Sequence, residues 1–202
     1  MTAPSTPHGQ PPHFPSYPGA GENGPTEPGG EHMSLGAEAL RGLLIALLVG
    51  VGGVVLGLVW LWLSPRIPMV SDGKNVYLKD TEGEQAIGSD GTFVLISVVL
   101  GAVSAAVVFW RYRHGGVGVV LGLAAGGALA ALIGWRIGVW LGPSTDIAAH
   151  AKAVGPGVVF DGPLKLRAMS ALVAWPAAAT VTHLVLTSAF GPRDSEPAVP
   201  RW

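Results

Sequence analysis

Four long apolar segments dominate the pattern of hydrophobic and polar positions along the chain. The first, residues 43–63, has no hydrogen-bonding side chains except the indoles of its tryptophans. As an α-helix it would be about 31 Å long at about 1.5 Å per residue, which matches the hydrocarbon core of a bilayer. The other three segments are 93–110, 117–141 and 168–190. We expect each of the four to form a transmembrane helix.

The polar segments between these runs indicate how the helices are connected. Residues 111–116 provide only a tight turn, so the second and third helices should form an antiparallel hairpin. Residues 64–92 and 142–167 are longer loops, which should lie together on one side of the membrane. Four spans also place both ends of the chain on the same side. The predicted fold class is therefore an all-α membrane protein, a bundle of four transmembrane helices with small extracytoplasmic loops.

Composition divides the chain into three parts. Only 12% of the residues are charged, whereas soluble proteins average about 25%. Residues 1–37 are rich in Pro, Gly and Ser, and we expect them to form a disordered tail. Residues 38–194 should form the membrane domain, and 195–202 a short C-terminal tail.

The distribution of Lys and Arg does not decide the orientation by number. With cytoplasmic termini, five of these residues would lie inside and six outside, counted as Arg41, Arg111, Arg113, Arg193 and Arg201 against Arg66, Lys74, Lys79, Lys152, Lys165 and Arg167. The short link after residue 110 carries two arginines, and a long polar tail without a signal sequence is easier to leave inside than to export. We therefore expect a multi-pass protein of the cell membrane with cytoplasmic N- and C-termini.

Tryptophans near the ends of the apolar segments suit the interface between lipid and water. Trp60, Trp62, Trp135 and Trp140 should lie near the outer ends of the first and third helices, and Trp110 at the inner end of the second. Their positions support the predicted limits of the spans.

The two outer loops contain short secondary-structure signals. Val70, a turn at 71–74 and Val76–Leu78 predict a small β-hairpin. Residues 143–146 predict the start of a helix at 147–154, which the turn at 155–157 ends. Two further apolar stretches, 158–160 and 164–166, flank a turn at 161–163. We expect the two loops to pack on each other.

Small residues recur every four positions along the third apolar segment. Such a stripe allows close approach of another helix, which is a main source of helix association in lipid. We interpret it as packing within the chain, with dimerisation or docking on a larger membrane complex as the alternative. The helix-packing residues of the prediction are Gly118, Gly122, Gly126, Gly134 and Gly138.

Two titratable residues inside the apolar segments are candidate functional positions, because intramembrane charge is often functional. Arg136 lies in the last third of its segment, where its side chain could reach the membrane surface and a lipid headgroup. His183 lies near the middle of the fourth segment, where a hydrogen-bonded structural role competes with a proton relay. The two should lie at different depths and not pair. Pro176 should kink the fourth helix.

Polar clusters in the outer loops do not form a recognisable catalytic or metal site. Asp80, Glu82 and Glu84 alternate, but the EF-hand pattern fails at Gln85 and Gly91. Ser144, Asp146 and His150 contain the residue types of a hydrolytic triad, although such triads rarely come from neighbouring positions. The sequence has no cysteine and a net charge of −1, which argues against thiolate chemistry and nucleic-acid binding. We predict no catalytic residues, cofactor or metal, and no enzymatic activity.

Several distinctive segments lie between about residues 40 and 194: Pro65–Pro68, Asp80–Gly88, Phe93, Trp135–Pro143, Asp161–Leu164 and Gly191–Asp194. In these segments the chain resembles a family of small actinobacterial membrane proteins classified only as a domain of unknown function. The resemblance implies a four-span protein of the cell membrane in a high-GC Gram-positive bacterium. Some members are labelled transporter permeases, and the family supplies no binding or catalytic residue.

These observations favour a non-enzymatic accessory or scaffold subunit of the cell envelope. Its expected partners are the lipid bilayer and either another membrane protein or a second copy of the chain. A permease subunit that works with a separate ATPase is the first alternative, although the spans hold only one Arg and one His. A membrane-embedded enzyme acting on lipid or cell-wall precursors is the second.

Overall fold

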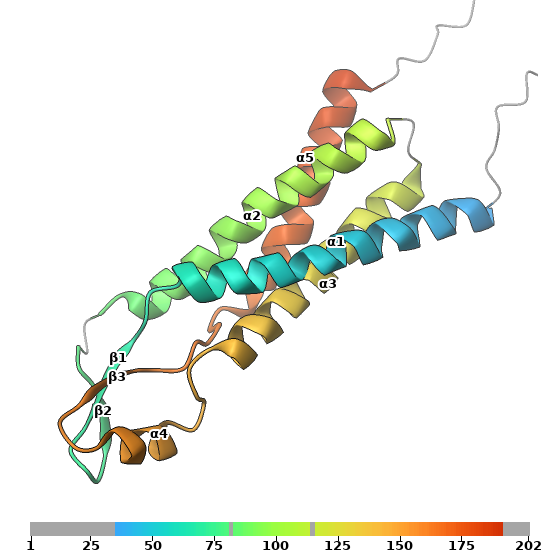
Figure 1. Cartoon of the computed structure of the whole chain (residues 1–202). Coiled ribbons are helices and arrows are strands. Elements are labelled where there is room, and N and C mark those ends of the chain that lie inside the picture. Colours follow the sequence, from blue (N-terminus) through green and yellow to red (C-terminus); the bar gives the residue numbers. More distant parts are fainter. Residues whose placement is uncertain (1–34, 81–82, 114–115, 192–202) are drawn as a thin grey trace, which may run out of the picture. The chain divides into compact units, whose positions relative to one another are not determined.

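A computed structural model describes residues 35–80, 83–113 and 116–191 (Figure 1). Most of the predicted tail, residues 1–34, and all of 195–202 lie outside the described residues. The long helices are α1 (Leu35–Leu63), α2 (Gln85–Arg111), α3 (Val117–Leu141) and α5 (Ala174–Phe190), and α5 is preceded by a 3₁₀ helix, η1 (Met169–Val173). The short elements are helix α4 (Ile147–Val154) and strands β1 (Pro68–Ser71), β2 (Val76–Leu78) and β3 (Val159–Asp161).

The described chain contains four helices long and apolar enough to cross a membrane: α1, α2, α3 and the continuous stretch Met169–Phe190. This confirms the prediction of four apolar helices. The first two begin earlier than predicted, at Leu35 and Gln85. Their extra turns are polar, so hydropathy alone missed them. Contacts with other elements hold these turns, as when Glu38 accepts a hydrogen bond from the Gly118 amide at 3.0 Å.

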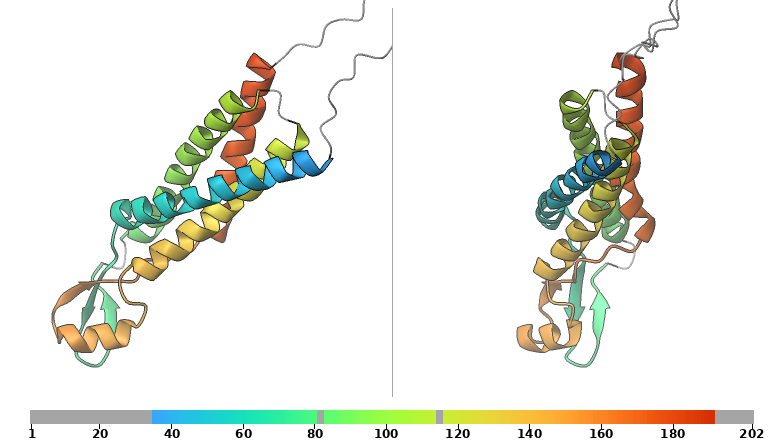
Figure 2. Two further views of the ribbon diagram at one scale, coloured as in Figure 1. Left: turned by 45° about the vertical axis from the view of Figure 1, so that its right-hand side comes forward. Right: turned by 90° about the vertical axis from the view of Figure 1, so that its right-hand side faces the viewer.

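The helices form two pairs, because α1 packs mainly on α3 and α2 mainly on α5 (Figures 1 and 2). The five predicted packing glycines of α3 all lie against α1. On the facing helix, a Cβ added to Gly42 would lie 2.7 Å from the carbonyl oxygen of Gly118. The backbones are therefore too close for larger side chains, and the stripe of small residues is used within the chain. The second helix pair has a similar close contact, where Gly101 of α2 faces the backbone of Trp175 in α5.

The bundle has two distinct ends (Figure 1). We call one the tail end, where α1 begins and α5 ends. We call the other the cap end, where the described parts of residues 64–84 and 142–168 form a small cap. The cap contains the strands and α4.

A three-stranded sheet organises the cap, with strand order β2-β1-β3 and both pairs antiparallel. The β1–β2 pair confirms the predicted hairpin, and the β1–β3 pair confirms that the two loops pack on each other. The fold is therefore mostly helical with a small sheet, not purely all-α. Residues 164–166, the apolar stretch after the predicted turn at 161–163, form no strand. The second loop instead donates a hydrogen bond from Gly162 to the carbonyl of Ile67.

Helix α4 covers one face of this sheet, and its limits agree with the prediction. The Asp146 carboxylate caps the helix by accepting a hydrogen bond from the Ala149 amide at 2.9 Å. Gly155 ends it with a φ of 88°, in the region that favours glycine. From α4, His150 stacks on Phe160 of β3, with ring centroids 5.0 Å apart.

One prediction about an individual side chain is wrong. Trp60 was placed at the lipid–water interface, but it is fully buried and meets Phe93 edge to face, with ring centroids 5.1 Å apart.

Pro176, which was expected to kink the fourth helix, lies in the first turn of α5 directly after η1. Its missing amide costs little there, because first-turn amides have no partner within their own helix.

Adding a methyl group at Gly53 tests the close contact between α1 and α3. A Cβ at Gly53 would lie 2.7 Å from the Cα of Ala130, which is backbone and cannot rotate away. We expect Gly53→Ala to destabilise the protein by about 1–3 kcal/mol, the usual cost of overpacking. Thermal unfolding in mild detergent, followed by tryptophan fluorescence, measures the effect.

Gly91→Ala in α2 is the matched control. The same methyl group would meet nothing within 4 Å there. This variant should be at least as stable as wild type, since alanine is the better helix former. Equal stability of both variants would contradict the proposed contact.

Candidate functional site

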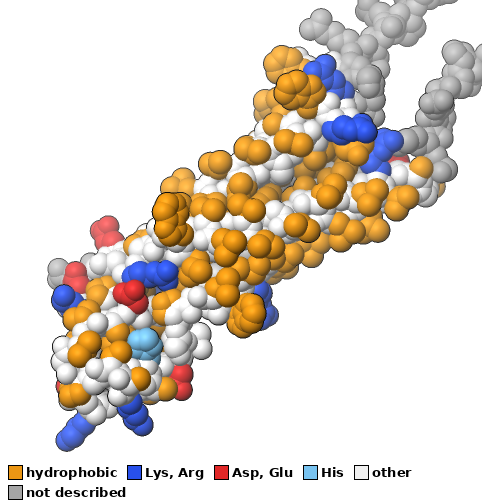
Figure 3. Space-filling view, in the orientation of Figure 1, with side chains coloured by type: hydrophobic (Ala, Val, Ile, Leu, Met, Phe, Trp, Pro, Cys, Tyr) orange, Lys and Arg blue, Asp and Glu red, His pale blue; other side chains and the backbone are white. Residues whose placement is uncertain are grey.

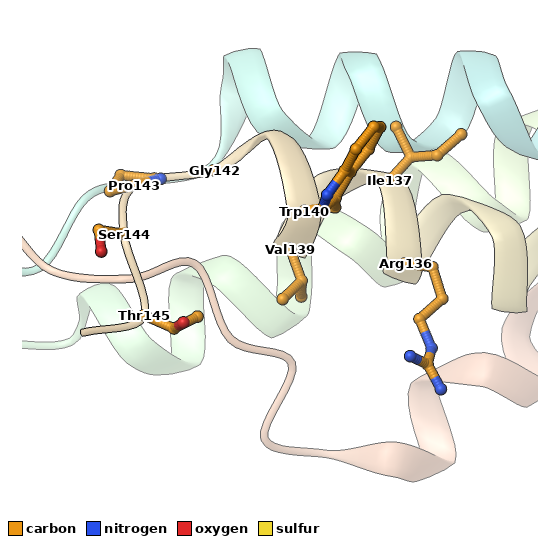
Figure 4. A pocket seen from close by; sticks show the side chains of 8 residues that line it. All are labelled: Arg136, Ile137, Val139, Trp140, Gly142, Pro143, Ser144 and Thr145. Carbon is orange, nitrogen blue, oxygen red and sulfur yellow. The ribbon is translucent and has the colours of Figure 1, made fainter.

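Arg136 lies near the cap end of α3, on an exposed part of the helix. Its side chain points to the opposite side of α3 from Ile137 (Figure 4). The guanidinium lies 5.0 Å from the ring centroid of Trp135, a cation–π contact that places the charge beside an aromatic surface. The charge therefore lies on the surface of the bundle and not in its core.

A hollow of about 660 Å³ lies beside Arg136 at the cap end. Its walls come from the last two turns of α3 and the loop that follows, with Trp140 and Thr145 among the lining residues (Figure 4). The hollow is open, and Arg136 is the one charged residue that lines it. The hollow could therefore bind an anion, but it has no pair of groups for acid–base chemistry.

His183 is buried between α5 and α2, near the tail end of α2. Its ring centroid lies 6.0 Å from that of Phe109, and the imidazole is hydrogen-bonded to the backbone of Ala105. Its Nδ1 has no hydrogen-bond partner among the described residues. Arg136 is near the opposite end of the bundle, so the structure does not bring the two predicted residues together.

The predicted polar clusters of the cap have structural contacts. The Asp146 carboxylate caps α4, and its amide donates to the Ser144 hydroxyl at 3.2 Å. The His150 ring stacks on Phe160. These three side chains therefore do not form a nucleophile–base–orienter chain. Glu82 of the acidic cluster lies outside the described residues, and within the described ranges no group of three metal-ligating side chains occurs.

A polar junction that no sequence motif indicated fixes the cap to the helices. The Trp60 indole donates to the Ser89 carbonyl at 2.9 Å, and the hydroxyls of Ser64 and Ser89 lie 2.7 Å apart. The Asp90 carboxylate accepts from the amides of Arg167 at 3.0 Å and Ala168 at 2.8 Å. The only available signal was the polar run before residue 93, which we assigned to a loop.

The sheet face opposite α4 carries a row of apolar side chains. The strand register places Tyr77, Val70 and Val159 side by side across all three strands. Tyr77 is 51% and Val159 46% exposed. Lys79 and Asp161 lie two residues along on the same face, because side chains alternate along a strand. We call these five residues the open sheet face.

The hairpin turn at Asp72 is held by its own carboxylate. One oxygen accepts from the amides of Asn75 at 2.7 Å and Lys74 at 2.8 Å. These backbone hydrogen bonds stabilise the charged form and lower the pKa of the Asp72 carboxyl below its ordinary value.

No family model, curated protein or solved structure matches this chain.

The carboxyl group of Asp72 in the hairpin turn should titrate with a pKa below the ordinary value for an aspartate. A lowered folded-state pKa means that the stabilisation is present above the unfolded pKa and is lost as the pH falls through the folded pKa. In NMR spectra of the detergent-solubilised protein, the amide shifts of Lys74 and Asn75 should move together with a midpoint below 3.8. In Asp72→Asn, whose side-chain carbonyl can accept the same bonds without titrating, this transition should disappear. A wild-type midpoint at or above 3.8 would disprove the assignment.

Proposed function

We propose that this protein is a non-enzymatic accessory subunit of the cell membrane. It spans the bilayer four times, keeps its tail end in the cytoplasm and presents its cap outside, where the open sheet face binds a protein of the cell envelope. The observation that carries the proposal is this exposed apolar row on a cap that hydrogen bonds fix to the helices.

The surface of the helices supports membrane insertion. Large apolar side chains are exposed along the bundle, for example Leu48 at 75%, Leu95 at 69% and Leu121 at 63%. Hydrophobic side chains cover much of the bundle face in Figure 3, and Lys and Arg side chains gather toward its ends. Exposing this much apolar surface to water is unfavourable, whereas the hydrocarbon core accommodates it.

The open sheet face has the composition of a small binding surface. Exposed contiguous apolar groups often mark interaction sites, and a polar rim around an apolar centre is typical of protein interfaces. Here Tyr77 and Val159 supply the centre, and Lys79 and Asp161 supply rim charges of opposite sign. Because the Ser64, Ser89 and Asp90 contacts hold the cap in place, little ordering of the cap would be needed on binding.

Two reporter fusions test the proposed orientation. Alkaline phosphatase fused after Asp161 in the cap should be active, because the enzyme requires an extracytoplasmic location. The same reporter fused after Arg113, between α2 and α3, should be inactive. Activity at Arg113 without activity at Asp161 would invert the orientation and remove the cap from the outer surface.

A charge introduced on the open sheet face should release the partner. We expect an envelope protein to co-purify in stoichiometric amounts with the tagged wild-type chain and to be lost in Val159→Glu. A carboxylate at that position would be desolvated at the interface, which is unfavourable. Quantitative mass spectrometry of the purified complexes measures the recovery.

Val158→Glu is the matched control, since Val158 is 45% exposed and precedes the strand. It introduces the same charge one residue away from the apolar row and should retain the partner. A photo-crosslinker at Tyr77 should join the same protein. Retention of the partner in both variants would disprove the proposed surface. Stoichiometric recovery of a nucleotide-binding ATPase would instead favour the permease subunit.

A further inference from the structure

A second apolar surface lies far from the cap, between α1 and α2. The two helices meet near the cap end, where Trp60 contacts Phe93, and diverge toward the tail end (Figures 1 and 2). This divergence leaves a groove of about 530 Å³ between the helix pairs. We call it the α1–α2 groove. Leu48 and Val55 of α1 line one side, Val103 and Val107 of α2 line the other, and Trp175 of α5 contributes from behind.

The length of the groove along α1 corresponds to the thickness of the hydrocarbon in one leaflet of a bilayer. Its lining on α1 extends from Leu44 to Val55, which is about 17 Å at about 1.5 Å per residue. The hydrocarbon core is about 30 Å thick, so half of it is about 15 Å. The side chains along the groove are open to the surroundings, with Leu48 75% and Val107 62% exposed. An acyl chain can therefore enter from the side without passing through the protein.

A cluster of arginines lies at the tail end of the groove. A second hollow, of about 500 Å³, is lined by Arg41, Arg111 and Arg113 and shares Leu44 and Tyr112 with the α1–α2 groove. The guanidinium of Arg41 lies 5.3 Å from the Tyr112 ring centroid, and that of Arg111 lies 5.1 Å from it. One aromatic ring thus holds two cations from different helices close together.

The nearby acidic residue does not neutralise this cluster. Glu38 lies one turn before Arg41 on α1, but its carboxylate is directed to α3, where it accepts a hydrogen bond from the Gly118 amide. Within the described part of the chain, no carboxylate forms an ion pair with Arg41 or Arg111. With respect to the described residues, the guanidinium groups of Arg41 and Arg111 are therefore available to bind an anion.

We propose that the α1–α2 groove is a binding site for one anionic phospholipid. Its phosphate binds Arg41 and Arg111, with Arg113 beside them, and one acyl chain occupies the groove. Guanidinium groups bind phosphate through charge-assisted hydrogen bonds, and basic pockets between transmembrane helices on the cytoplasmic side recognise acidic headgroups. The site depends on the membrane insertion proposed above but not on a partner of the cap.

The arginines should distinguish anionic from zwitterionic lipid. The full chain, purified in a neutral detergent, is titrated with phosphatidylglycerol or phosphatidylcholine and examined by native mass spectrometry. We expect one phosphatidylglycerol to bind with a higher affinity than phosphatidylcholine. The double variant Arg41→Gln/Arg111→Gln should weaken phosphatidylglycerol binding roughly tenfold or more. The cap-end double variant Lys165→Gln/Arg167→Gln removes the same charge from two exposed side chains and should leave this binding unchanged.

A matched pair of tryptophan substitutions tests the acyl-chain contact. Val103 lines the groove and is 54% exposed, whereas Val99, one turn away on α2, is 60% exposed and does not line it. Val103→Trp should fill the groove and weaken phosphatidylglycerol binding with all arginines present. Val99→Trp should not. Thermal unfolding of both variants shows whether each remains folded.

Several results would overturn the proposal. Equal binding of the two lipids, or equal effects of the tail-end and cap-end double variants, would show that the groove does not select anionic lipid. Binding of inorganic phosphate as tightly as phosphatidylglycerol, with no effect of Val103→Trp, would identify a phosphate site without an acyl chain. A native dimer that Val103→Trp converts to a monomer would show that a second copy occupies the groove. Failure of the cap experiment leaves all of these measurements unaffected.

Discussion

The close approach of α1 and α3 is the contact on which the rest of the bundle depends. Burial of apolar surface does not drive helices together in lipid, so association depends on van der Waals contact and weak Cα–H···O bonds. Small residues on both helices allow that contact, as where Gly42 and Gly122 face each other. The glycines weaken each helix alone, since glycine is a poor helix former, but they permit a backbone separation that larger side chains would prevent.

The pairing of α1 with α3 and of α2 with α5 explains where the bundle is open. Bulky side chains join the pairs near the cap, where Trp60 meets Phe93, and Trp175 reaches between the helices at mid-depth. Toward the tail end, α1 and α2 diverge, and the side chains that line the space between them are mainly aliphatic, as with Leu48 and Val107. The apolar groove, and the position of Arg41 and Arg111 at its tail end, are therefore consequences of how the two helix pairs are joined. A lipid acyl chain in the groove would fill the space that the side chains of α1 and α2 leave open.

Side-chain hydrogen bonds between distant segments are concentrated where the helices meet the cap. The hydroxyls of Ser64 and Ser89 bond to each other, and the Asp90 carboxylate accepts from the Arg167 and Ala168 amides just before η1, where backbone groups lack partners. These bonds connect segments far apart in sequence and hold the small sheet against the helices. A fixed cap on one end and an open apolar groove on the other would let the same protein contact an envelope partner and a specific lipid independently.

The sequence alone determined the local features of this protein: four apolar helices, the hairpin at Asp72, helix α4 and the four-residue repeat of glycines. Each of these follows from composition or periodicity within one segment. Only the tertiary structure decided that the glycines face α1, that Val159–Asp161 pairs with β1, and that Trp60 is buried although its position near a helix end suggested an interface. The tertiary structure likewise decided where the α1–α2 groove lies and that Arg41 and Arg111 lie at its tail end. These features depend on which surfaces fit together over long separations in the chain, and no local pattern encodes the choice of partner.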